Sequence, residues 1–375
     1  MSISGTAAVN TITGGAGNDT IDGGGGADVI NAAGGDDTVI YRGSEISIDG
    51  GTGSDTLLLP AGSTVTAVNF AVAAGVDQTA GDSVAVTNFE NLNASAMTTA
   101  LTVTGSALGN TLATGSGDDI IHGGGGADII NAGGGNDSVD YWGSEISIAG
   151  GSGSNTLVVR TSATLDLSAT DQTLSDLTAV SGFQNIDATS LNSTQSISVV
   201  GSAAANTISG GAGADVIDGG GGADVINAGG GNDTVTVRGS ETSADGGSGS
   251  DTMILRAGTS VTAVDFGVLA GNDQTTGDSV NVTNFENLDA SAVTTNLTVT
   301  GGAGANVITT GSGNDVIHGG GGADIITSGT GNDAVDYWGS EVSIDGGGGT
   351  NTLLLRAAAT VDLGSVDQTS GDSTT

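Results

Sequence analysis

The stretch GGAGNDTIDGGGGADVINAAGGDDTVI, residues 14–40, returns to the same residue types every nine positions. Each nonapeptide opens with glycine and other small residues, and an Asp separates this half from Thr, Val and Ile. Glycine reaches positive φ angles without a Cβ clash, which is typical of a tight turn. Thr, Val and Ile suit a short strand. The stretch therefore predicts a repeated turn and strand, and not a disordered linker.

The nine-residue period continues far beyond this stretch. Six nonapeptides fill residues 5–58, and equivalent blocks fill 105–158, 201–254 and 301–354, which makes 24 units. The eighth position is Ile, Leu, Val or Met in 23 units, with Ala244 as the exception, and the sixth is Asp in 14 and Asn in 6. The fifth unit of each block instead carries a Glu one position earlier. Blocks 196 residues apart resemble each other most, so the chain is two copies of a two-block repeat.

The composition favours bound cations. The 375 residues include 42 Asp and Glu against 5 Lys and Arg, for a formal net charge of -37. This charge argues against nucleic acid and anionic membranes as partners. The sequence has no run of 18 apolar residues and does not begin with a signal-peptide pattern, so we expect no membrane insertion.

Two nonapeptides are expected to close one coil of a solenoid, with the eighth-position aliphatic in a thin core. Turns then alternate sides, so that Asp19 lies beside Asp37, and Asp37 beside Asp55, on one edge. Carboxylates at the spacing of stacked strands, about 4.8 Å, repel one another. A hard dication removes this repulsion, and carboxylates with glycine carbonyls give the oxygen-only shell that Ca²⁺ prefers over Mg²⁺.

GGAGNDTID, GGGGADVIN, AGGGNDSVD and TGSGNDVIH resemble the nonapeptide of the RTX (repeats-in-toxin) proteins. The resemblance implies an all-β fold, a parallel β-roll or β-solenoid with several Ca²⁺ ions bound between stacked glycine-rich turns. It also implies type I secretion from a Gram-negative cell and folding on calcium outside. Carried over position by position, the ligand role falls on the sixth-position aspartates: Asp19, Asp28, Asp37, Asp55, Asp119, Asp128, Asp137, Asp215, Asp224, Asp233, Asp251, Asp315, Asp324 and Asp333.

The fifth units depart from the RTX pattern, because they lack both the glycine pair and the Asp. Their turns are expected to bind calcium weakly or through the glutamates Glu45, Glu145, Glu241 and Glu341. Units with a sixth-position Asn supply a neutral ligand at best, and we expect weaker or empty sites there.

The inter-block segments 59–104, 159–200 and 255–300 repeat as well, with motifs such as VTNFENLNAS. We expect them to continue the solenoid in longer coils, with Phe89, Phe183 and Phe285 in a wider core. The sequence thus predicts four modules, 1–104, 105–200, 201–300 and a shorter 301–375. Each segment also places two aspartates five residues apart in a DQT loop: Asp77 and Asp82, Asp171 and Asp176, Asp273 and Asp278, and Asp367 and Asp372. We favour a polar protruding loop, and an extra Ca²⁺ site or an interface between molecules is the alternative.

No catalytic motif is present, and we expect no enzyme activity. His122 and His318 lack the second His or Cys that a zinc site needs, so outward strand-end positions are expected. Aromatic residues open most of the fifth units, as in Tyr141 and Trp142. They could be sugar-stacking platforms, but we favour covers for turns that lack glycines.

Three functions remain open. The first is a calcium-binding structural segment of a large secreted or cell-surface bacterial protein of the adhesin, surface-layer or matrix type. The second is the non-catalytic RTX region of a secreted protease, lipase, epimerase or toxin, and the third is a polysaccharide-binding module. The length and modularity favour the first. Calcium is the expected partner, with other copies of the chain or cell-surface polysaccharide as further candidates. The chain looks like a section of a longer array.

Overall fold

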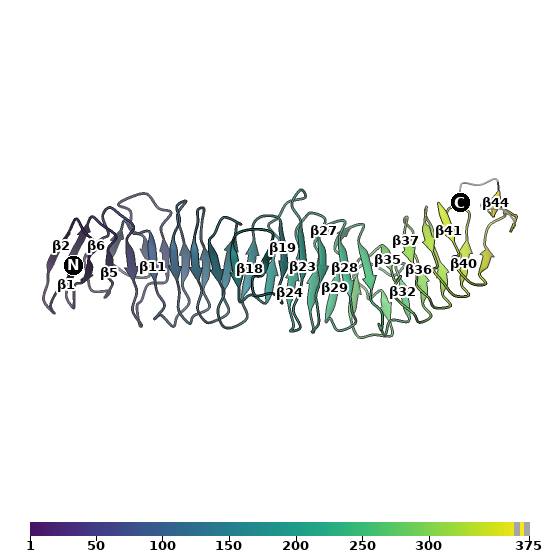
Figure 1. The fold of residues 1–375 in the computed structure, drawn as a ribbon, viewed down its shortest axis with the longest axis horizontal. Helices are drawn as coiled ribbons and strands as arrows, with labels where there is room; N and C mark the ends of the chain where they lie inside the picture. The colour runs from purple at the N-terminus through teal and green to yellow at the C-terminus, as the bar shows by residue number, and fades with distance from the viewer. Residues whose placement is uncertain (364–367, 371–375) are drawn as a thin grey trace. The chain divides into compact units, whose positions relative to one another are not determined.

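Every regular element in residues 1–363 and 368–370, which a computed structural model describes, is a β-strand. The strands are two to five residues long, and most pair in parallel with the strand one coil away (Figure 1). The fold is therefore a parallel β-solenoid, as the nonapeptide pattern predicts. Within the described ranges, no helix has the length and apolar character needed to cross a membrane.

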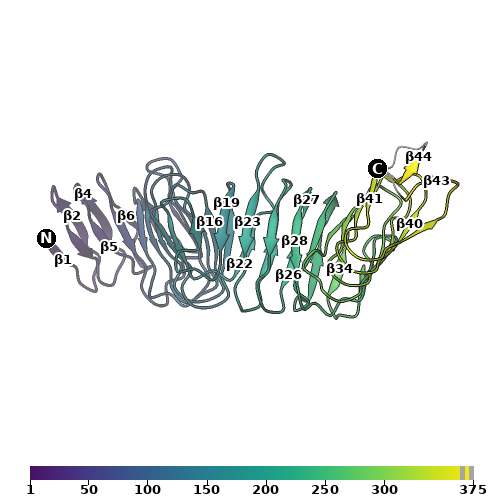
Figure 2. The same ribbon diagram turned by 45° about the vertical axis from the view of Figure 1, so that its right-hand side comes forward.

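The chain divides into two compact units, and the boundary between them falls inside the second predicted module, 105–200. Unit 1 comprises 1–161 and 169–186, and unit 2 comprises 162–168 and 187–375. The finer division into four modules stays a prediction. Figure 2 shows the strands of each unit stacking as successive rungs.

Unit 1 contains two series of stacked strands. One face consists of β1 (Ser2–Ser4), β3 (Thr20–Asp22), β5 (Thr38–Ile40), β7 (Thr56–Leu58), β11 (Asn91–Asn93), β13 (Thr111–Ala113), β15 (Ile129–Asn131), β17 (Ser147–Ala149) and β21 (Ala179–Ser181). The remaining strands are β2 (Thr11–Gly15), β4 (Val29–Ala33), β6 (Ser47–Asp49), β10 (Ala85–Thr87), β9 (Thr79–Ala80), β8 (Ala67–Asn69), β12 (Thr102–Thr104), β14 (Ile120–His122), β16 (Ser138–Tyr141), β18 (Thr156–Val159), β20 (Thr173–Leu174) and β22 (Asn185–Asp187).

Unit 2 repeats this arrangement. One face consists of β19 (Ala163–Asp166), β23 (Ile197–Val200), β25 (Val216–Asp218), β28 (Thr234–Val237), β31 (Thr252–Leu255), β35 (Asn287–Asp289), β37 (Val307–Thr309), β39 (Ile325–Thr327) and β41 (Ser343–Asp345). The remaining strands are β24 (Thr207–Ser209), β26 (Val225–Asn227), β29 (Ser243–Asp245), β34 (Asn281–Thr283), β33 (Thr275–Thr276), β32 (Ala263–Asp265), β36 (Thr298–Thr300), β38 (Val316–His318), β40 (Ala334–Tyr337), β42 (Thr352–Leu355), β27 (Gly230–Gly231), β30 (Ser248–Gly249), β43 (Thr360–Val361) and β44 (Thr369–Ser370).

The strand register confirms a coil of two nonapeptides. Ile21 of β3 pairs with Val39 of β5, and Val39 with Leu57 of β7, at steps of 18 residues. These three eighth-position side chains are fully buried. The eighth-position side chains therefore form a single file of buried aliphatic residues along this face.

The inter-block segments continue the solenoid, as predicted. β11 pairs with β7 on one side, where Asn91 lies opposite Thr56, and with β13 on the other, where Leu92 lies opposite Leu112. Phe89, Phe183 and Phe285 are each only 1% exposed, so they fill the core of these longer coils.

The DQT loops are fastened to the fifth-unit turns by a tyrosine hydroxyl. Tyr41 donates to Oδ2 of Asp82 at 2.7 Å, and Tyr141 donates to Oδ2 of Asp176 at 2.5 Å. Both rings are buried, so these tyrosines are not stacking platforms. In these loops the Asp carboxylates act as hydrogen-bond acceptors, which agrees with the favoured loop interpretation. A metal role for the loops stays untested, and Asp367 and Asp372 lie outside the described residues.

The third module lacks this tyrosine latch. Val237 stands where Tyr41 and Tyr141 stand, and Oδ2 of Asp278 is buried without a hydrogen-bond partner. A Cβ added to Gly239 would meet no atom within 4 Å, whereas one added to Gly43 would lie 3.3 Å from the Tyr41 ring. Space for a tyrosine ring is therefore open in the third module.

Val237→Tyr is expected to stabilise unit 2, because the new hydroxyl would satisfy Asp278 as Tyr141 satisfies Asp176. Tyr141→Phe should cost about 1–3 kcal/mol, the range for a hydrogen bond to a charged group. Urea unfolding in saturating calcium would measure both changes. A Tyr141→Phe variant as stable as the parent would contradict the latch.

Candidate calcium sites

The sixth-position aspartates form hydrogen-bonded ladders along the turn edges. The amide of Asp19 donates to Oδ1 of Asp37 at 2.7 Å, and the amide of Asp37 donates to Oδ1 of Asp55 at 2.8 Å. The same bond recurs between Asp119 and Asp137, Asp215 and Asp233, Asp233 and Asp251, and Asp315 and Asp333. On the other edge the donors are the sixth-position asparagines, to Asp28, Asp128, Asp224 and Asp324. The predicted neighbours 18 residues apart are thus brought together.

The second carboxylate oxygen of these aspartates has almost no donor available. In 12 of the 14 residues Oδ2 is buried and has no hydrogen-bond partner: Asp28, Asp37, Asp55, Asp119, Asp128, Asp137, Asp224, Asp233, Asp251, Asp315, Asp324 and Asp333. In Asp19 and Asp215 this oxygen accepts the amide of Gly15 or Gly211. A buried carboxylate oxygen without a partner is costly, and a cation removes that cost.

Stacked turns approach one another closely at these edges, so that a glycine of one turn lies against a backbone carbonyl of the next. Gly53 has a φ of 139°, and a Cβ added there would lie 2.0 Å from the carbonyl oxygen of Gly35 in the neighbouring turn. Gly153 has the same relation to Gly135, at 1.9 Å. Only glycine allows this approach, so it is the glycines that bring the carbonyl oxygens of adjacent turns into contact with the edge.

The donor set fits calcium. Across the described residues, no group of three or more His, Cys, Asp or Glu side chains is placed to hold a metal ion. Each predicted site must therefore combine at most two carboxylates with carbonyl oxygens. That combination suits the flexible oxygen shell of Ca²⁺, and the sixth-position aspartates are the residues that would hold it.

The four fifth-unit glutamates close their own turns. In Glu45, Oε1 accepts the amide of Arg42 at 2.8 Å and Oε2 accepts the amide of Ser44 at 3.0 Å. Glu145, Glu241 and Glu341 make the equivalent bonds. These bonds replace the missing glycine geometry, and the metal role of the four glutamates stays a prediction.

Sequence reasoning missed three residues that extend the ladder into the inter-block coils. Glu90, Gln184 and Glu286 accept the amides of Asp55, Asn155 and Asp251, each at 2.8 Å. The signal was present, because Glu90 precedes Asn-Leu as Asp55 precedes Thr-Leu. The segment Glu90-Asn91-Leu92 thus takes the structural place of positions six to eight of a nonapeptide, although the rest of the motif is absent.

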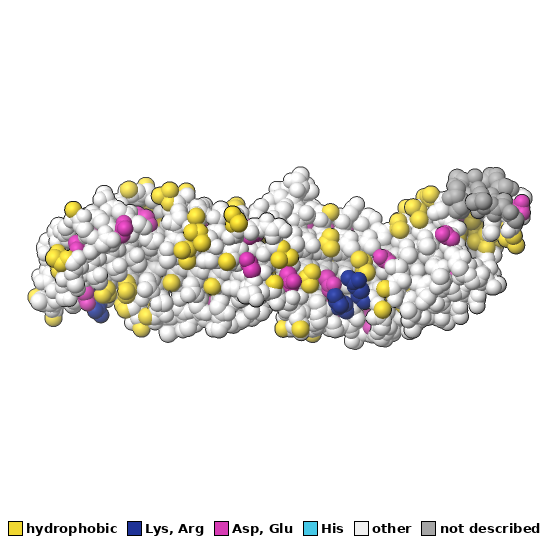
Figure 3. All heavy atoms as spheres, in the orientation of Figure 1, with side chains coloured by type: hydrophobic (Ala, Val, Ile, Leu, Met, Phe, Trp, Pro, Cys, Tyr) yellow, Lys and Arg dark blue, Asp and Glu magenta, His cyan; other side chains and the backbone are white. Residues whose placement is uncertain are grey.

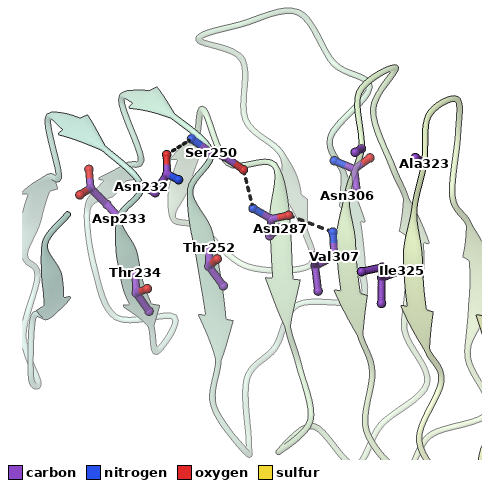
Figure 4. Close-up of a pocket in the computed structure, with 11 residues that line it drawn as sticks. Asn232, Asp233, Thr234, Ser250, Thr252, Asn287, Asn306, Val307, Ala323 and Ile325 are labelled. Carbon is purple, nitrogen blue, oxygen red and sulfur yellow. Dashed lines mark hydrogen bonds between the residues drawn. The ribbon is translucent and has the colours of Figure 1, made fainter. Parts of the chain in front are cut away.

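Next to this edge in unit 2, a groove of about 430 Å³ follows the outward side of β28, β31, β35, β37 and β39. Figure 4 shows a polar chain along it, in which Asn232 accepts the amide of Ser250 and Asn287 donates to the Ser250 hydroxyl. Asn287 also accepts the amide of Val307 at 2.9 Å. These bonds tie the inter-block coil to the blocks on both sides.

The histidines lie on the outward strand surface, as predicted. Nδ1 of His122 lies 2.9 Å from Oδ2 of Asp140, which also pairs with Arg160. His318, Asp336 and Arg356 repeat this group. The hydrogen bond to Asp140 raises the pKa of His122. Each His is thus a member of an ion-pair group away from the turn edges.

Burial raises the pKa of several ladder carboxylates. The pKa of Asp55 rises to about 7, chiefly through burial, with the charges of Glu90 and Asp37 adding to it. Burial likewise raises the pKa of Asp233 to about 7 and those of Asp128, Asp137 and Asp251 to about 6. Without metal, Asp55 and Asp233, with pKa values of about 7, are therefore partly protonated at neutral pH.

The geometry defines a parallel β-roll whose stacked nonapeptide turns bring rows of buried carboxylates to their edges. The family profile of the RTX calcium-binding nonapeptide repeat matches the chain in four copies, at residues 4–39, 104–139, 200–235 and 300–335. The chain therefore contains four copies of the RTX calcium-binding repeat, which confirms the resemblance seen in the sequence. A sequence comparison with curated proteins found no match.

Gly53→Ala is expected to cost about 3 kcal/mol or more, because alanine is strained at this φ and its Cβ would clash with Gly35. Gly17→Ala is the matched control, since its Cβ would meet no atom within 4 Å. The control should change stability by less than about 0.5 kcal/mol. Urea unfolding in calcium would compare the two, and equal losses would contradict the role of stacked turns.

Calcium affinity is expected to fall as the pH is lowered from 8 to 5.5. The pKa values of Asp55 and Asp233 in the metal-free fold are about 7, above the usual value of about 3.9 in an unfolded chain. Calcium must therefore displace protons from the fold, while the metal-free fold itself gains stability as the pH falls through 7. Calorimetric titration in buffers of different ionisation enthalpy would measure the released protons. If the calcium affinity stayed the same across this pH range, the burial of these groups would be contradicted.

Proposed function

We propose that this chain is a calcium-binding structural segment of a larger secreted or cell-surface bacterial protein, and that it folds when calcium is bound after export. The observation that carries the proposal is the row of buried Oδ2 atoms without donors on the turn edges. The proposed ions are several per chain, held by the sixth-position aspartates and turn carbonyls. In the low calcium of a cytosol the same edges would oppose folding.

The location and the structural role are supported by the match to RTX repeats, which are generally found in secreted proteins. The modularity supports a structural role over the non-catalytic region of an enzyme or toxin, because the same calcium-type coil recurs through both units. An RTX β-roll is a structural calcium-binding domain, and the expectation that the chain is not an enzyme stays a prediction.

Polysaccharide binding is a weaker candidate. Tyr41, Tyr141 and Tyr337 are buried, whereas Trp142 and Trp338 are 48% and 49% exposed. Of these five aromatic residues, only the two tryptophans could therefore stack on a sugar ring, and both lie in fifth-unit turns.

Calcium is expected to induce the fold. Circular dichroism should show β-structure appearing as calcium is added to chelated protein, because binding to the folded state alone stabilises it. Magnesium at the same concentration should be much less effective, since it prefers rigid octahedral sites. A chain that keeps its full β-signal in excess EDTA at pH 8 would contradict the proposal.

A further inference from the structure

At the ends of the first and third blocks, two ladder positions hold carboxylates. The same two positions at the end of the second block hold side-chain amides. In the first module the amide of Asp37 donates to Oδ1 of Asp55, and the amide of Asp55 donates to Oε2 of Glu90, both at 2.8 Å. Glu90 therefore takes the place of the next aspartate in the ladder, although it lies 35 residues further on. The third module repeats the arrangement with Asp233, Asp251 and Glu286.

The second module fills the same positions with neutral side chains. The amide of Asp137 donates to Oδ1 of Asn155 at 2.9 Å, and the amide of Asn155 donates to Oε1 of Gln184 at 2.8 Å. The side-chain Nδ2 of Asn155 then donates to the carbonyl oxygen of Gly182 at 2.9 Å. All hydrogen-bonding atoms of the Asn155 side chain that face this edge are thus engaged within the protein.

In the first module the atom that corresponds to Nδ2 of Asn155 is an acceptor. Asp55 is fully buried, and its Oδ2 has no hydrogen-bond partner. The carbonyl of Asn88 takes the place of the Gly182 carbonyl: a Cβ added to Gly50 would lie 2.2 Å from the Asn88 oxygen, and one added to Gly150 would lie 2.6 Å from the Gly182 oxygen. Oδ2 of Asp55 therefore stands in place of a donor, at an edge that the Asn88 carbonyl also lines, and no group of the protein donates to it.

A buried carboxylate oxygen without a donor needs a positive charge beside it. The nearest ladder neighbour adds a second carboxylate, because the chain has Glu90 where the second module has Gln184. In each module both residues of the pair are acids or both are amides. Asp55 occurs with Glu90 and Asp251 with Glu286, whereas Asn155 occurs with Gln184. Two acids with a carbonyl suit a divalent oxygen-preferring cation, and two amides suit direct hydrogen bonds.

We propose that Asp55, Glu90 and the carbonyl of Asn88 form an additional calcium site at the exit of the first block, and that Asp251, Glu286 and the carbonyl of Asn284 form its equivalent in the third. Glu90 and Glu286 lie outside the nonapeptides and outside the residues matched by the RTX family profile. The second module has no such site, because the Asn155 amide occupies it. This inference rests on the calcium binding proposed above.

The test is the number of calcium ions bound by the full chain, measured by equilibrium dialysis and metal analysis at pH 8. E90Q/E286Q is expected to bind two ions fewer than the parent. The variant should keep its fold, because Gln184 shows that a glutamine accepts the same ladder bond. The reverse change, N155D/Q184E, should add one ion.

The matched control is D36N/D118N, which also removes two charges from the turn region. Asp36 and Asp118 are exposed fifth-position residues, and Asn occupies that position in other units. The control should bind as many ions as the parent. A parent that binds no calcium would refute the proposed function itself. If the parent binds calcium and E90Q/E286Q binds as many ions, the additional sites are refuted, and a proton between Asp55 and Asn88 would explain the pair.

Discussion

The fold depends on the close approach of carboxylate and carbonyl oxygen atoms of adjacent coils at the turn edges. Each amide of the aspartate ladder already donates to the Oδ1 one coil away, as Asp19 does to Asp37. The other carboxylate oxygen is buried without a donor in most of these aspartates. Buried acceptors of this kind destabilise a fold unless a cation or a proton joins them. Calcium ions at the edges, as proposed above, would therefore couple folding to calcium.

Burial of the apolar core is not enough to stabilise the fold. Each nonapeptide contributes one eighth-position aliphatic, such as Ile21, Val39 or Leu57, to a single file of buried side chains. Burial of one such side chain stabilises by about 1.5–3 kcal/mol, whereas ordering nine residues costs roughly 1–2 kcal/mol each in backbone entropy. Strand pairing and turn-to-turn contacts must supply the rest, and both require that adjacent turns approach closely. The ions proposed for the edges are what would permit that approach.

The sequence predicted those parts of the structure that obey the nine-residue period. The coil of 18 residues, the buried Val39 and the neighbours Asp19 and Asp37 all follow from strict spacing, since register repeats when each coil has the same length. Glu90 escaped notice because it lies 35 residues from Asp55, and only the folded inter-block coil shows that the two are ladder neighbours. The latch of Tyr41 on Asp82 was missed for the same reason, because its partners are 41 residues apart across a coil of different length.

The placement of the positive charges explains why most of the neutralising charge at the edges must come from solution, since the amino group of Met1 pairs with Asp19 alone, at 2.7 Å. All five arginines of the chain pair with outward ninth-position aspartates: Arg42 with Asp22, Arg160 with Asp140, Arg238 and Arg256 with Asp218, and Arg356 with Asp336. On the face drawn in Figure 3, the Lys and Arg atoms lie in small groups beside acidic side chains. None of these pairs includes a sixth-position aspartate of a turn. With the arginines engaged on the strand surfaces, the ladder carboxylates have no side-chain cation of their own. A lysine or arginine at each edge would neutralise the ladder carboxylates without metal. Because the arginines pair elsewhere, the fold can require calcium.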